Sequence, residues 1–352
     1  MPVNVAVIGC GAIGQRRHIP EAAANANAKL VAVCDVNKPR VQEVAQEYGA
    51  QAFTDHKEML KALGDRIEAV VVGTPNYLHA QQTIDALGAG KHVLVEKPMA
   101  ATRDEAKAMI KAAEKNKKFL MVGQNQRLMP PHVKAKEILD SDKLGRPLAF
   151  QTTFKHSGPE GWSLDGAKSW FFRKNEAIMG VTGDLGVHKA DLMRFLLDQE
   201  FTEVCGFLAT TDKKDEKGKP IGLDDSAFLT LKTNAGVVGS MTISWTNYGN
   251  FEDNGTTIYC EKGVLRIGED PKFGIVVGYR SGGREYHELG AIATNTRQTN
   301  SGVMDMFVRS IITKEPPPID GMEGYRSLDV IITAMESAQQ GKTLKIANGG
   351  RR

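Results

Sequence analysis

The chain has 352 residues, more than one typical hydrophobic core organises and enough for two domains. With 41% hydrophobic and 25% charged residues, it has the composition of an ordinary soluble globular protein. The net charge of +3 is small for this size and argues against a nucleic acid or a membrane surface as partner.

The N-terminal residues and the cysteines indicate in which cellular compartment to expect the protein. The first residues show neither the charged leader nor the apolar segment of a signal peptide, and no apolar run is long enough to span a bilayer. The four cysteines are scattered and form no C-x-x-C pair, which suits free thiols better than a disulfide frame or a zinc site: Cys10, Cys34, Cys205 and Cys260. We therefore expect a cytoplasmic protein without a bound metal.

A buried strand at residues 5–8 leads directly into a G-x-G-x-x-G loop at residues 9–14. Gly9 permits the tight turn, Gly11 lets the backbone approach a pyrophosphate, and Gly14 lets the next helix pack close to the strand. The amino end of that helix offers free N–H groups and the positive end of its dipole. The loop predicts a dinucleotide site formed by Gly9, Gly11, Ala12, Ile13 and Gly14.

A second strand at residues 30–34 ends on Asp35, which follows Gly14 by about 20 positions, as the dinucleotide fingerprint requires. An acidic residue there accepts hydrogen bonds from the adenosine ribose and repels a 2′-phosphate, which favours NAD over NADP. Lys38 and Arg40 lie close by and could soften that preference, so NADP stays possible. Asp35 could also simply end a strand and open a turn.

Strands and helices alternate as far as residue 123. Strands are expected at 69–73, 92–95 and 119–123, with an extended piece at 53–54; helices are expected at 38–48, 56–63, 77–87 and 103–116. Such alternation demands a parallel sheet with right-handed crossovers.

Two of these strands end on polar residues beside a proline, Thr74-Pro75-Asn76 and Glu96-Lys97-Pro98. Pro98 cannot continue a sheet ladder, so the Lys97 ammonium is fixed at the carboxyl end of a strand. Ligands of open α/β sheets bind just outside such ends. Taken alone, Lys97 would be explained as a surface lysine in a turn.

From residue 147 onward the pattern becomes one of successive strands without helices between most of them. This argues for a largely antiparallel sheet, with strands at 148–154, 203–211, 227–232, 237–245, 256–260, 264–267, 275–279 and 284–289. We place the domain boundary near residues 123–127, which gives domains 1–125 and 126–352. The helices at 302–313 and 322–340 are expected to brace the second sheet.

The segment 184–196 has the apolar periodicity of a helix and carries Asp184 and His188 on one face, one turn apart. A carboxylate that meets an imidazole could orient it and raise its basicity. Singly, Asp184 would be a helix cap and His188 a packed or surface histidine. The pairing makes both candidates for acid–base chemistry.

Residues 158–173 form a long loop rich in aromatic and cationic side chains. Aromatic faces beside hydrogen-bond donors suit a polyol ring, and an aromatic cluster that packs the domain interface explains the loop equally well. Trp162, Trp170 and Arg173 are the candidates for substrate contact here. Gln124 and Arg127, which follow the last strand of the first domain, are two further candidates.

Taken in order, these motifs resemble the Gfo/Idh/MocA oxidoreductases: the glycine loop followed by His18, then Pro75-Asn76-Tyr77-Leu78-His79, then Glu96-Lys97-Pro98. The resemblance implies a Rossmann domain followed by an α/β domain with a large, mainly antiparallel open sheet. It also implies a cis bond before Pro98, Lys97 in the active site, and acid–base roles for Asp184 and His188. We assign to the cofactor, beyond the loop and Asp35, the residues Thr74, Pro75, Asn76, His79, Glu96 and Lys97.

The resemblance implies reversible oxidation of a secondary hydroxyl of a cyclitol or sugar. His188 would remove the hydroxyl proton, Lys97 would stabilise the alkoxide, and Asp184 would orient His188 or hold a neighbouring hydroxyl. Open sheets of this family often form subunit interfaces, so we expect a homodimer or homotetramer through the second sheet. No dense arginine cluster demands a phosphate, which favours a cyclitol or free monosaccharide.

Three alternatives stay open. The first is an NADP-dependent sugar reductase of the same fold, and the second is a glycosidase that uses transient NAD oxidation. The third is a dinucleotide-sensing regulator without catalysis. The joint presence of Lys97, Asp184 and His188 speaks against the regulator, which has no need of the set.

Overall fold

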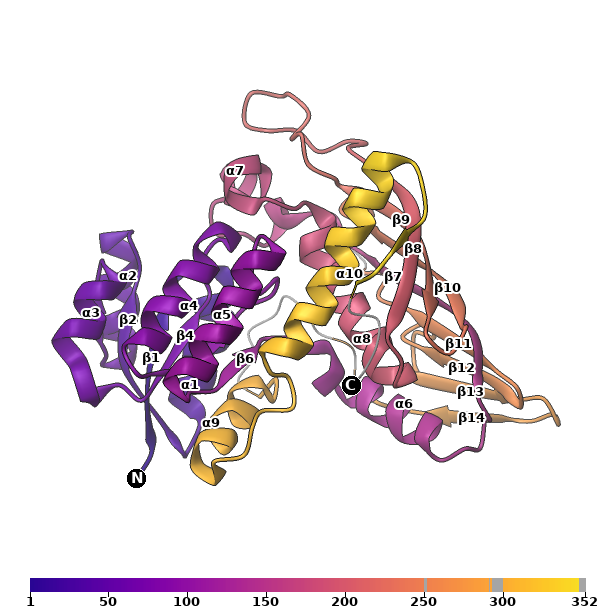
Figure 1. The fold of residues 1–352 in the computed structure, drawn as a ribbon, viewed down its shortest axis with the longest axis horizontal. Helices are drawn as coiled ribbons and strands as arrows, with labels where there is room; N and C mark the ends of the chain where they lie inside the picture. The colour runs from indigo at the N-terminus through magenta and orange to yellow at the C-terminus, as the bar shows by residue number, and fades with distance from the viewer. Residues whose placement is uncertain (250–251, 291, 293–299, 348–352) are drawn as a thin grey trace.

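The computed structural model describes residues 1–249, 252–290, 292 and 300–347 (Figure 1). Its first sheet is entirely parallel, with strand order β3-β2-β1-β4-β5-β6. The strands are β1 Val3–Ile8, β2 Ala28–Cys34, β3 Gln51–Phe53, β4 Ala69–Val72, β5 His92–Val95 and β6 Leu120–Val122. The parallel sheet predicted from strand–helix alternation is confirmed.

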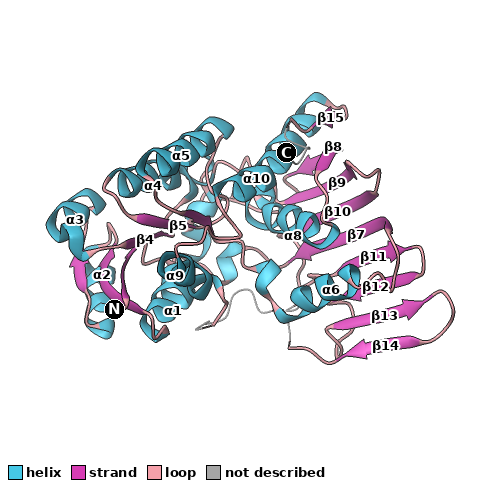
Figure 2. Cartoon of the chain, turned by 60° about the horizontal axis from the view of Figure 1, so that its bottom comes forward, coloured by secondary structure: helices cyan, strands magenta, loops and turns pink. Residues whose placement is uncertain are grey.

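Helices cover both faces of this sheet, which explains why its strands are nearly continuous apolar runs. Figure 2 shows α4 and α5 on one face and α1 on the other. The helices are α1 Ile19–Ala24, α2 Lys38–Tyr48, α3 His56–Leu63, α4 His79–Gly88 and α5 Arg103–Asn116. Helix α5 begins at a capping box, in which Thr102 and Glu105 each accept a hydrogen bond from the other's backbone N–H.

The second sheet has nine strands in the order β14-β13-β12-β11-β7-β10-β9-β8-β15. They are β7 Pro147–Lys155, β8 Phe201–Ala209, β9 Ser226–Thr233, β10 Val238–Ser244, β11 Thr256–Cys260, β12 Gly263–Ile267, β13 Ile275–Tyr279, β14 Arg284–His287 and β15 Leu344–Lys345. All neighbours pair antiparallel except β7 and β10, so the expected mainly antiparallel sheet is confirmed.

The parallel pairing of β7 with β10 has a consequence for the site. Lys155 lies opposite Ser244 at the carboxyl ends of the two strands. His156 and Trp245 follow these residues directly, and the His156 N–H donates to the Ser244 carbonyl at 3.1 Å. Both side chains therefore start from the same edge of the second sheet.

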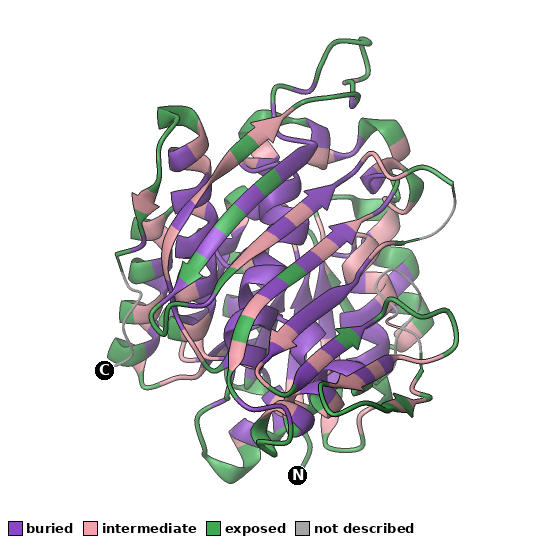
Figure 3. Cartoon of the chain, turned by 90° about the vertical axis from the view of Figure 1, so that its right-hand side faces the viewer, coloured by how far each residue is buried: buried purple, intermediate pink, exposed green. Residues whose placement is uncertain are grey.

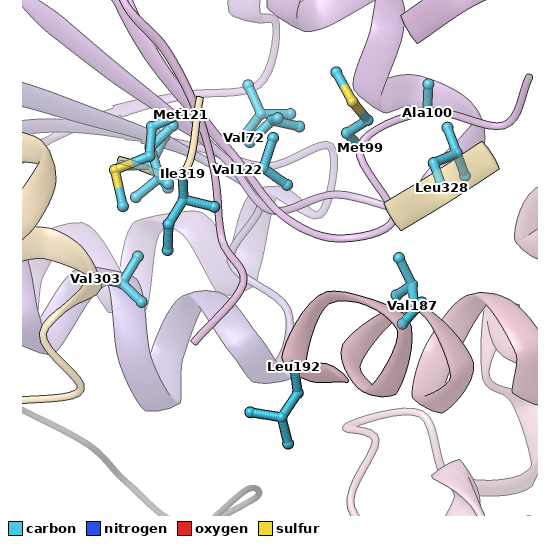
Figure 4. Packing of buried hydrophobic residues seen from close by; sticks show 14 of the residues in the cluster. Val72, Met99, Ala100, Met121, Val122, Val187, Leu192, Val303, Ile319 and Leu328 are labelled. Carbon is cyan, nitrogen blue, oxygen red and sulfur yellow. The ribbon is translucent and has the colours of Figure 1, made fainter. Parts of the chain in front are cut away.

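Helices α6 Pro130–Asp140, α8 Val187–Leu197 and α10 Gly321–Gln340 lie on the side of the second sheet that faces the first domain (Figure 1). In Figure 3, no helix of the described residues lies in front of the opposite face of the sheet. The apolar core continues from one domain to the other. Figure 4 shows Val187 of α8 and Leu328 of α10 near Met99 and Ala100, which follow β5.

One expectation for the C-terminal helices is wrong. Helix α9, Val303–Thr313, packs on the first domain beside β1 and not on the second sheet. The Asn25 amide donates to Asp305 of α9 at 2.6 Å. Helix α10 contacts both domains, because Arg103 of α5 pairs with Asp329 and Glu336 at 2.5 Å each. The amphipathic pattern identified the helices but not the surface that each one covers.

Candidate active site

A cleft of about 410 Å³ opens where the carboxyl edge of the first sheet faces the second domain. That volume is within the range of small-molecule and cofactor sites. Its walls include most of the predicted site residues from both domains: Gly9, Gly11, Ala12, Ile13, Asp35, Thr74, Pro75, Asn76, His79, Glu96, Lys97, Trp162, Trp170, Arg173, Asp184 and His188. One end of the cleft is the glycine loop, and the other is a cluster of ionisable and aromatic side chains.

The glycine loop has the close approaches that its sequence predicts. Gly9 has φ +105°, and a Cβ there would lie 2.4 Å from the Gly73 carbonyl oxygen. A Cβ on Gly14 would lie 2.1 Å from the Gly9 carbonyl oxygen, so only glycine fits at position 14. A Cβ on Gly11 would meet no atom within 4 Å, which leaves open space along the cleft wall. The loop therefore fits a pyrophosphate that approaches the backbone.

Asp35 stands at the end of β2 and holds the loop. Its Oδ2 accepts the Cys10 N–H at 2.8 Å, and its Oδ1 accepts the Asn37 N–H at 2.8 Å. Arg40, which also lines the cleft, pairs with Asp165 of the second domain at 3.2 Å. The segment 158–173 thus crosses to the end of the cleft where an adenosine would bind.

The ends of β4 and β5 are joined by His79. Its Nδ1 lies 2.9 Å from the Pro98 carbonyl oxygen, and its Nε2 lies 2.8 Å from the Thr74 carbonyl oxygen. The Lys97–Pro98 bond is cis, as the family resemblance implied. The buried Glu96 bonds His18 Nε2 at 2.8 Å. Burial opposes its ionisation, but His18, Arg17 and Lys97 together hold the pKa of Glu96 far below its usual range.

Lys97 and Asp184 form a close pair across the two domains. The Lys97 Nζ lies 2.8 Å from Asp184 Oδ1 and 3.0 Å from the Asp184 carbonyl oxygen. The second carboxylate oxygen, Oδ2, accepts the Trp245 indole N–H at 3.0 Å. Burial opposes ionisation of Asp184, but the charges of Lys97 and His156 and these hydrogen bonds hold its pKa below the usual value.

His188 is buried, and its Nδ1 has no hydrogen-bond partner among the residues that the structure describes. Its ring lies 6.0 Å from the Phe154 ring, centroid to centroid. Burial, and then the charge of Lys97, lowers the pKa of His188 well below its usual value. The imidazole is therefore neutral at physiological pH, the state that a general base requires.

The expected contact between Asp184 and His188 is wrong. Asp184 lies in the π-helical turn Thr182–Gly186, and α8 begins only at Val187. Residues four apart do not stack across an i→i+5 turn as they do in an α-helix. Within the described residues, no hydrogen bond joins the two side chains, and Asp184 bonds Lys97 and Trp245 instead.

The segment 158–173 forms short 3₁₀ turns with its aromatic rings in contact. Trp170 stacks on Phe171 at 3.9 Å, and Trp162 meets Phe171 edge-on at 5.0 Å. Phe171 in turn meets the edge of Trp245 at 6.1 Å. The aromatic cluster both lines the cleft and packs the junction between the domains. Contact of these rings with a substrate stays a prediction.

Comparison with known proteins settles the family. Residues 3–124 match the family model described as "Oxidoreductase family, NAD-binding Rossmann fold", and residues 132–266 match the "GFO/IDH/MocA C-terminal domain". The chain belongs to the Gfo/Idh/MocA oxidoreductases. The resemblance inferred from the motifs is confirmed, and so is an NAD-binding Rossmann domain.

The curated relatives of this Gfo/Idh/MocA chain include dehydrogenases of sugars and of inositols. Levoglucosan dehydrogenase of Pseudarthrobacter phenanthrenivorans is 31% identical over 285 residues, which cover 72% of each chain. Inositol 2-dehydrogenase of Rubrobacter xylanophilus is 27% identical over 98% of this chain and 93% of that protein. A structure of levoglucosan dehydrogenase in complex with NADH and levoglucosan superposes with a TM-score of 0.86 at 24% identity, covering 99% and 100% of the two chains. That likeness shows that the fold is shared.

Two predicted substrate residues of the Gfo/Idh/MocA chain lie outside the cleft walls. The buried Arg127 guanidinium pairs with Asp191 of α8, with Nε 2.8 Å from Oδ2, and with Glu323 at 3.4 Å. A buried guanidinium needs such carboxylate partners, and these leave Arg127 unavailable to a ligand. Gln124 is 1% exposed and is not in the cleft wall, although neither of its side-chain amide atoms has a hydrogen-bond partner in the described part of the chain.

The prediction left out several residues of the cleft wall, among them Asn125, Phe154 and His156. It also left out Trp245, which bonds Asp184. Phe154 belongs to β7, and His156 and Trp245 follow the two strands that pair in parallel. A position at or just after the end of a predicted strand is a signal that the sequence carries, and it could have identified His156 and Trp245. The parallel pairing of β7 with β10, far apart in sequence, is what brings them to one place.

Two further features of the chain concern metals and membranes. Within residues 1–249, 252–290, 292 and 300–347, no three His, Cys, Asp or Glu side chains are grouped so as to hold a metal ion. In the same part of the chain, no helix has both the length and the apolar character needed to cross a membrane. All four cysteines are free thiols, as predicted, and burial raises the pKa of Cys10 and of Cys34 to about 12.

Proposed function

We propose that the protein is an NAD-dependent dehydrogenase that reversibly oxidises a secondary hydroxyl of a cyclitol or sugar to a ketone. The observation that carries this proposal is the meeting of Lys97, Asp184 and His188 in one cleft with the glycine loop. The names of the relatives support it, since they include inositol and levoglucosan dehydrogenases.

The cofactor would lie along the first sheet's carboxyl edge. We assign to it the residues Gly9, Gly11, Ala12, Ile13, Gly14, Asp35, Thr74, Pro75, Asn76, His79, Glu96 and Lys97. Bound NAD supplies the acceptor for the hydride. The Asp35 carboxylate in the cleft wall opposes a 2′-phosphate, which favours NAD over NADP.

Two side chains would handle the substrate's hydroxyl proton and charge. Neutral His188 accepts the hydroxyl proton as general base. The Lys97 ammonium donates a hydrogen bond to the same oxygen and stabilises its developing negative charge. Asp184 holds Lys97 in place through the 2.8 Å bond from Nζ to Oδ1. The expectation was that it orients His188 or holds a neighbouring hydroxyl of the substrate, and the second of these roles stays a prediction.

The substrate end of the cleft favours a neutral polyol. Trp162 and Trp170 offer aromatic faces for the apolar C–H side of a sugar ring. Arg173, the cation beside them, is already paired with Glu176 at 2.7 Å. We therefore propose a free cyclitol or monosaccharide as substrate, bound through Lys97, Trp162, Trp170, Arg173, Asp184 and His188, with Gln124 and Arg127 dropped from that set.

The experiment is to follow NADH appearance with the purified protein. NAD and NADP would be offered separately with myo-inositol, scyllo-inositol, common aldoses, and glucose against glucose 6-phosphate. We expect NAD reduction by one neutral polyol. Preference for NADP would favour the reductase, preference for the phosphate ester would overturn the substrate class, and aglycone release without net NADH would favour the glycosidase.

We further propose a cytoplasmic homodimer or homotetramer built through the second sheet, with residues 1–125 as the cofactor domain and 126–352 as the substrate and assembly domain. The helix-free face of the sheet supports this assembly. Phe207 of β8 and Phe228 of β9 are register partners there, 80% and 53% exposed. Adjacent exposed aromatic rings are typical of surfaces that a partner covers.

A further inference from the structure

We infer that Trp245 is a positioning residue: its indole N–H fixes the Asp184 carboxylate so that the other oxygen holds Lys97, an inference that rests on the proposed function. The two donors occupy different oxygens of one carboxylate. Trp245 Nε1 is 3.0 Å from Oδ2, and Lys97 Nζ is 2.8 Å from Oδ1. Each bond thereby limits rotation of the carboxylate about the bond to Cβ.

The indole is held from several sides. Trp245 is fully buried, and its backbone N–H donates to the Asp225 carbonyl at 2.8 Å. The rings of Phe171 and Phe172 meet it edge-on at 6.1 Å and 6.3 Å. A donor fixed in this way cannot follow a carboxylate that moves, so it defines where Oδ2 must lie.

Asp184 needs such a second anchor. It lies in a π-helical turn, and Lys97, its other partner, reaches it from the opposite domain. His156 is the nearest alternative donor, but its Nε2 is 3.8 Å from Oδ2, beyond hydrogen-bond distance. Removal of the indole N–H would therefore leave a buried carboxylate oxygen without a hydrogen-bond partner among the described residues.

The same contacts join Asp184 to the substrate wall. Phe171 touches Trp245 on one side and stacks on Trp170 on the other. A displacement of the wall formed by segment 158–173 therefore reaches the Asp184 carboxylate through two ring contacts. The position of Lys97 depends on the same chain of contacts, because the bond to Asp184 holds its ammonium.

The steady-state test uses Trp245→Phe, which keeps an aromatic ring and removes the N–H. Loss of one hydrogen bond to a charged group predicts a fall in kcat/KM of about tenfold or more, with KM for NAD unchanged. The acid limb of the kcat/KM profile should move to higher pH, because the lost bond had favoured ionised Asp184. Phe201→Leu is the control: it shortens a buried side chain of the same domain and should not move the acid limb.

A second measurement does not depend on activity. The chain has three tryptophans, so an ¹⁵N–¹H spectrum holds three indole signals, and the one lost in Trp245→Phe is identified. Asp184→Asn should shift that signal far more than the other two. An unmoved signal, or a folded Trp245→Phe with wild-type kcat/KM and pH profile, would overturn the inference. If the wild type oxidises no polyol, the proposed function fails, while the indole signal still decides whether Trp245 anchors Asp184.

Discussion

At the scale of single residues, the proposed chemistry assigns the general base to His188 and the hydrogen-bond donor to Lys97. His188 is kept neutral by burial and by the nearby Lys97 charge, while the Lys97 Nζ lies 2.8 Å from Asp184 Oδ1. We predict that His188→Ala and Lys97→Met each lower kcat by roughly 10²–10⁴-fold, the usual worth of general acid–base help. Initial rates of NADH formation measure this loss.

Binding of NADH separates the loss of chemistry from a loss of the site. Both variants should bind NADH with nearly wild-type affinity by fluorescence titration, because the glycine loop and Asp35 are untouched. Near-normal turnover in the double variant would refute the assignment of both residues.

Lys189 shows what a buried charge does away from the cleft walls. Its ammonium is fully buried, and its hydrogen-bond contacts to the described residues are long, to the Gly255 oxygen at 3.5 Å and to Thr256 Oγ1 at 3.4 Å. Burial lowers the pKa of Lys189 to about 7. Between pH 7 and about 10 the unfolded chain therefore binds more protons than the folded one, so this group destabilises the fold most below pH 7.

Lys189→Met should remove that penalty. We expect Tm to rise by about 2–4 °C at pH 6 and the difference to shrink as pH approaches 10. Thermal unfolding followed by circular dichroism at both pH values tests this. Lys111→Met, at an exposed position of α5, should change Tm little, and a lower Tm for Lys189→Met at pH 6 would contradict the prediction.

At the scale of elements, the π-helical turn that carries Asp184 depends on the loop before it. Asp224 accepts the Gly180 N–H at 3.1 Å and the Thr182 N–H at 2.7 Å, which fixes the start of the turn. A Cβ on Gly180 would lie 1.9 Å from the Asp224 carbonyl oxygen. The turn and the Asp224 backbone therefore approach each other as closely as glycine allows.

Gly180→Ala should force these segments apart. We expect a loss of roughly 1–3 kcal/mol in the free energy of unfolding, together with a fall in kcat as Asp184 moves away from Lys97. Denaturant unfolding and the NADH assay measure the two effects. Gly88→Ala at the end of α4 meets no atom within 4 Å and should keep both values; equal behaviour of the two variants would count against this account.

At the scale of the whole molecule, the open face of the second sheet predicts the assembly. Phe207→Lys with Phe228→Lys would place two charges where β8 and β9 expose adjacent rings. Light scattering after size exclusion should then report the monomer mass, against a multiple of it for the wild type. Ile312→Lys on α9 is the exposed apolar control, and a monomeric wild type would remove the proposal.

Much of the fold could be predicted because its signals are local. Buried valine strands, the glycine loop, and helices such as Lys38–Tyr48 and Arg103–Asn116 lie where periodicity and caps placed them. Pairing between distant segments was not predictable in this way. The surface covered by α9 and the parallel neighbour of β7 each depend on a choice among several compatible partners.

The sequence by itself determined the NAD-binding fold of the first domain, the family, and the presence of Lys97, Asp184 and His188 in the chain, because each is written in a short contiguous motif. Only the tertiary structure decided the partners of these residues. It paired Asp184 with Lys97 and Trp245 and not with His188, and it buried Arg127 against Asp191. The physical reason is that a charged side chain removed from water must find its partner in three dimensions, wherever that partner lies in the sequence.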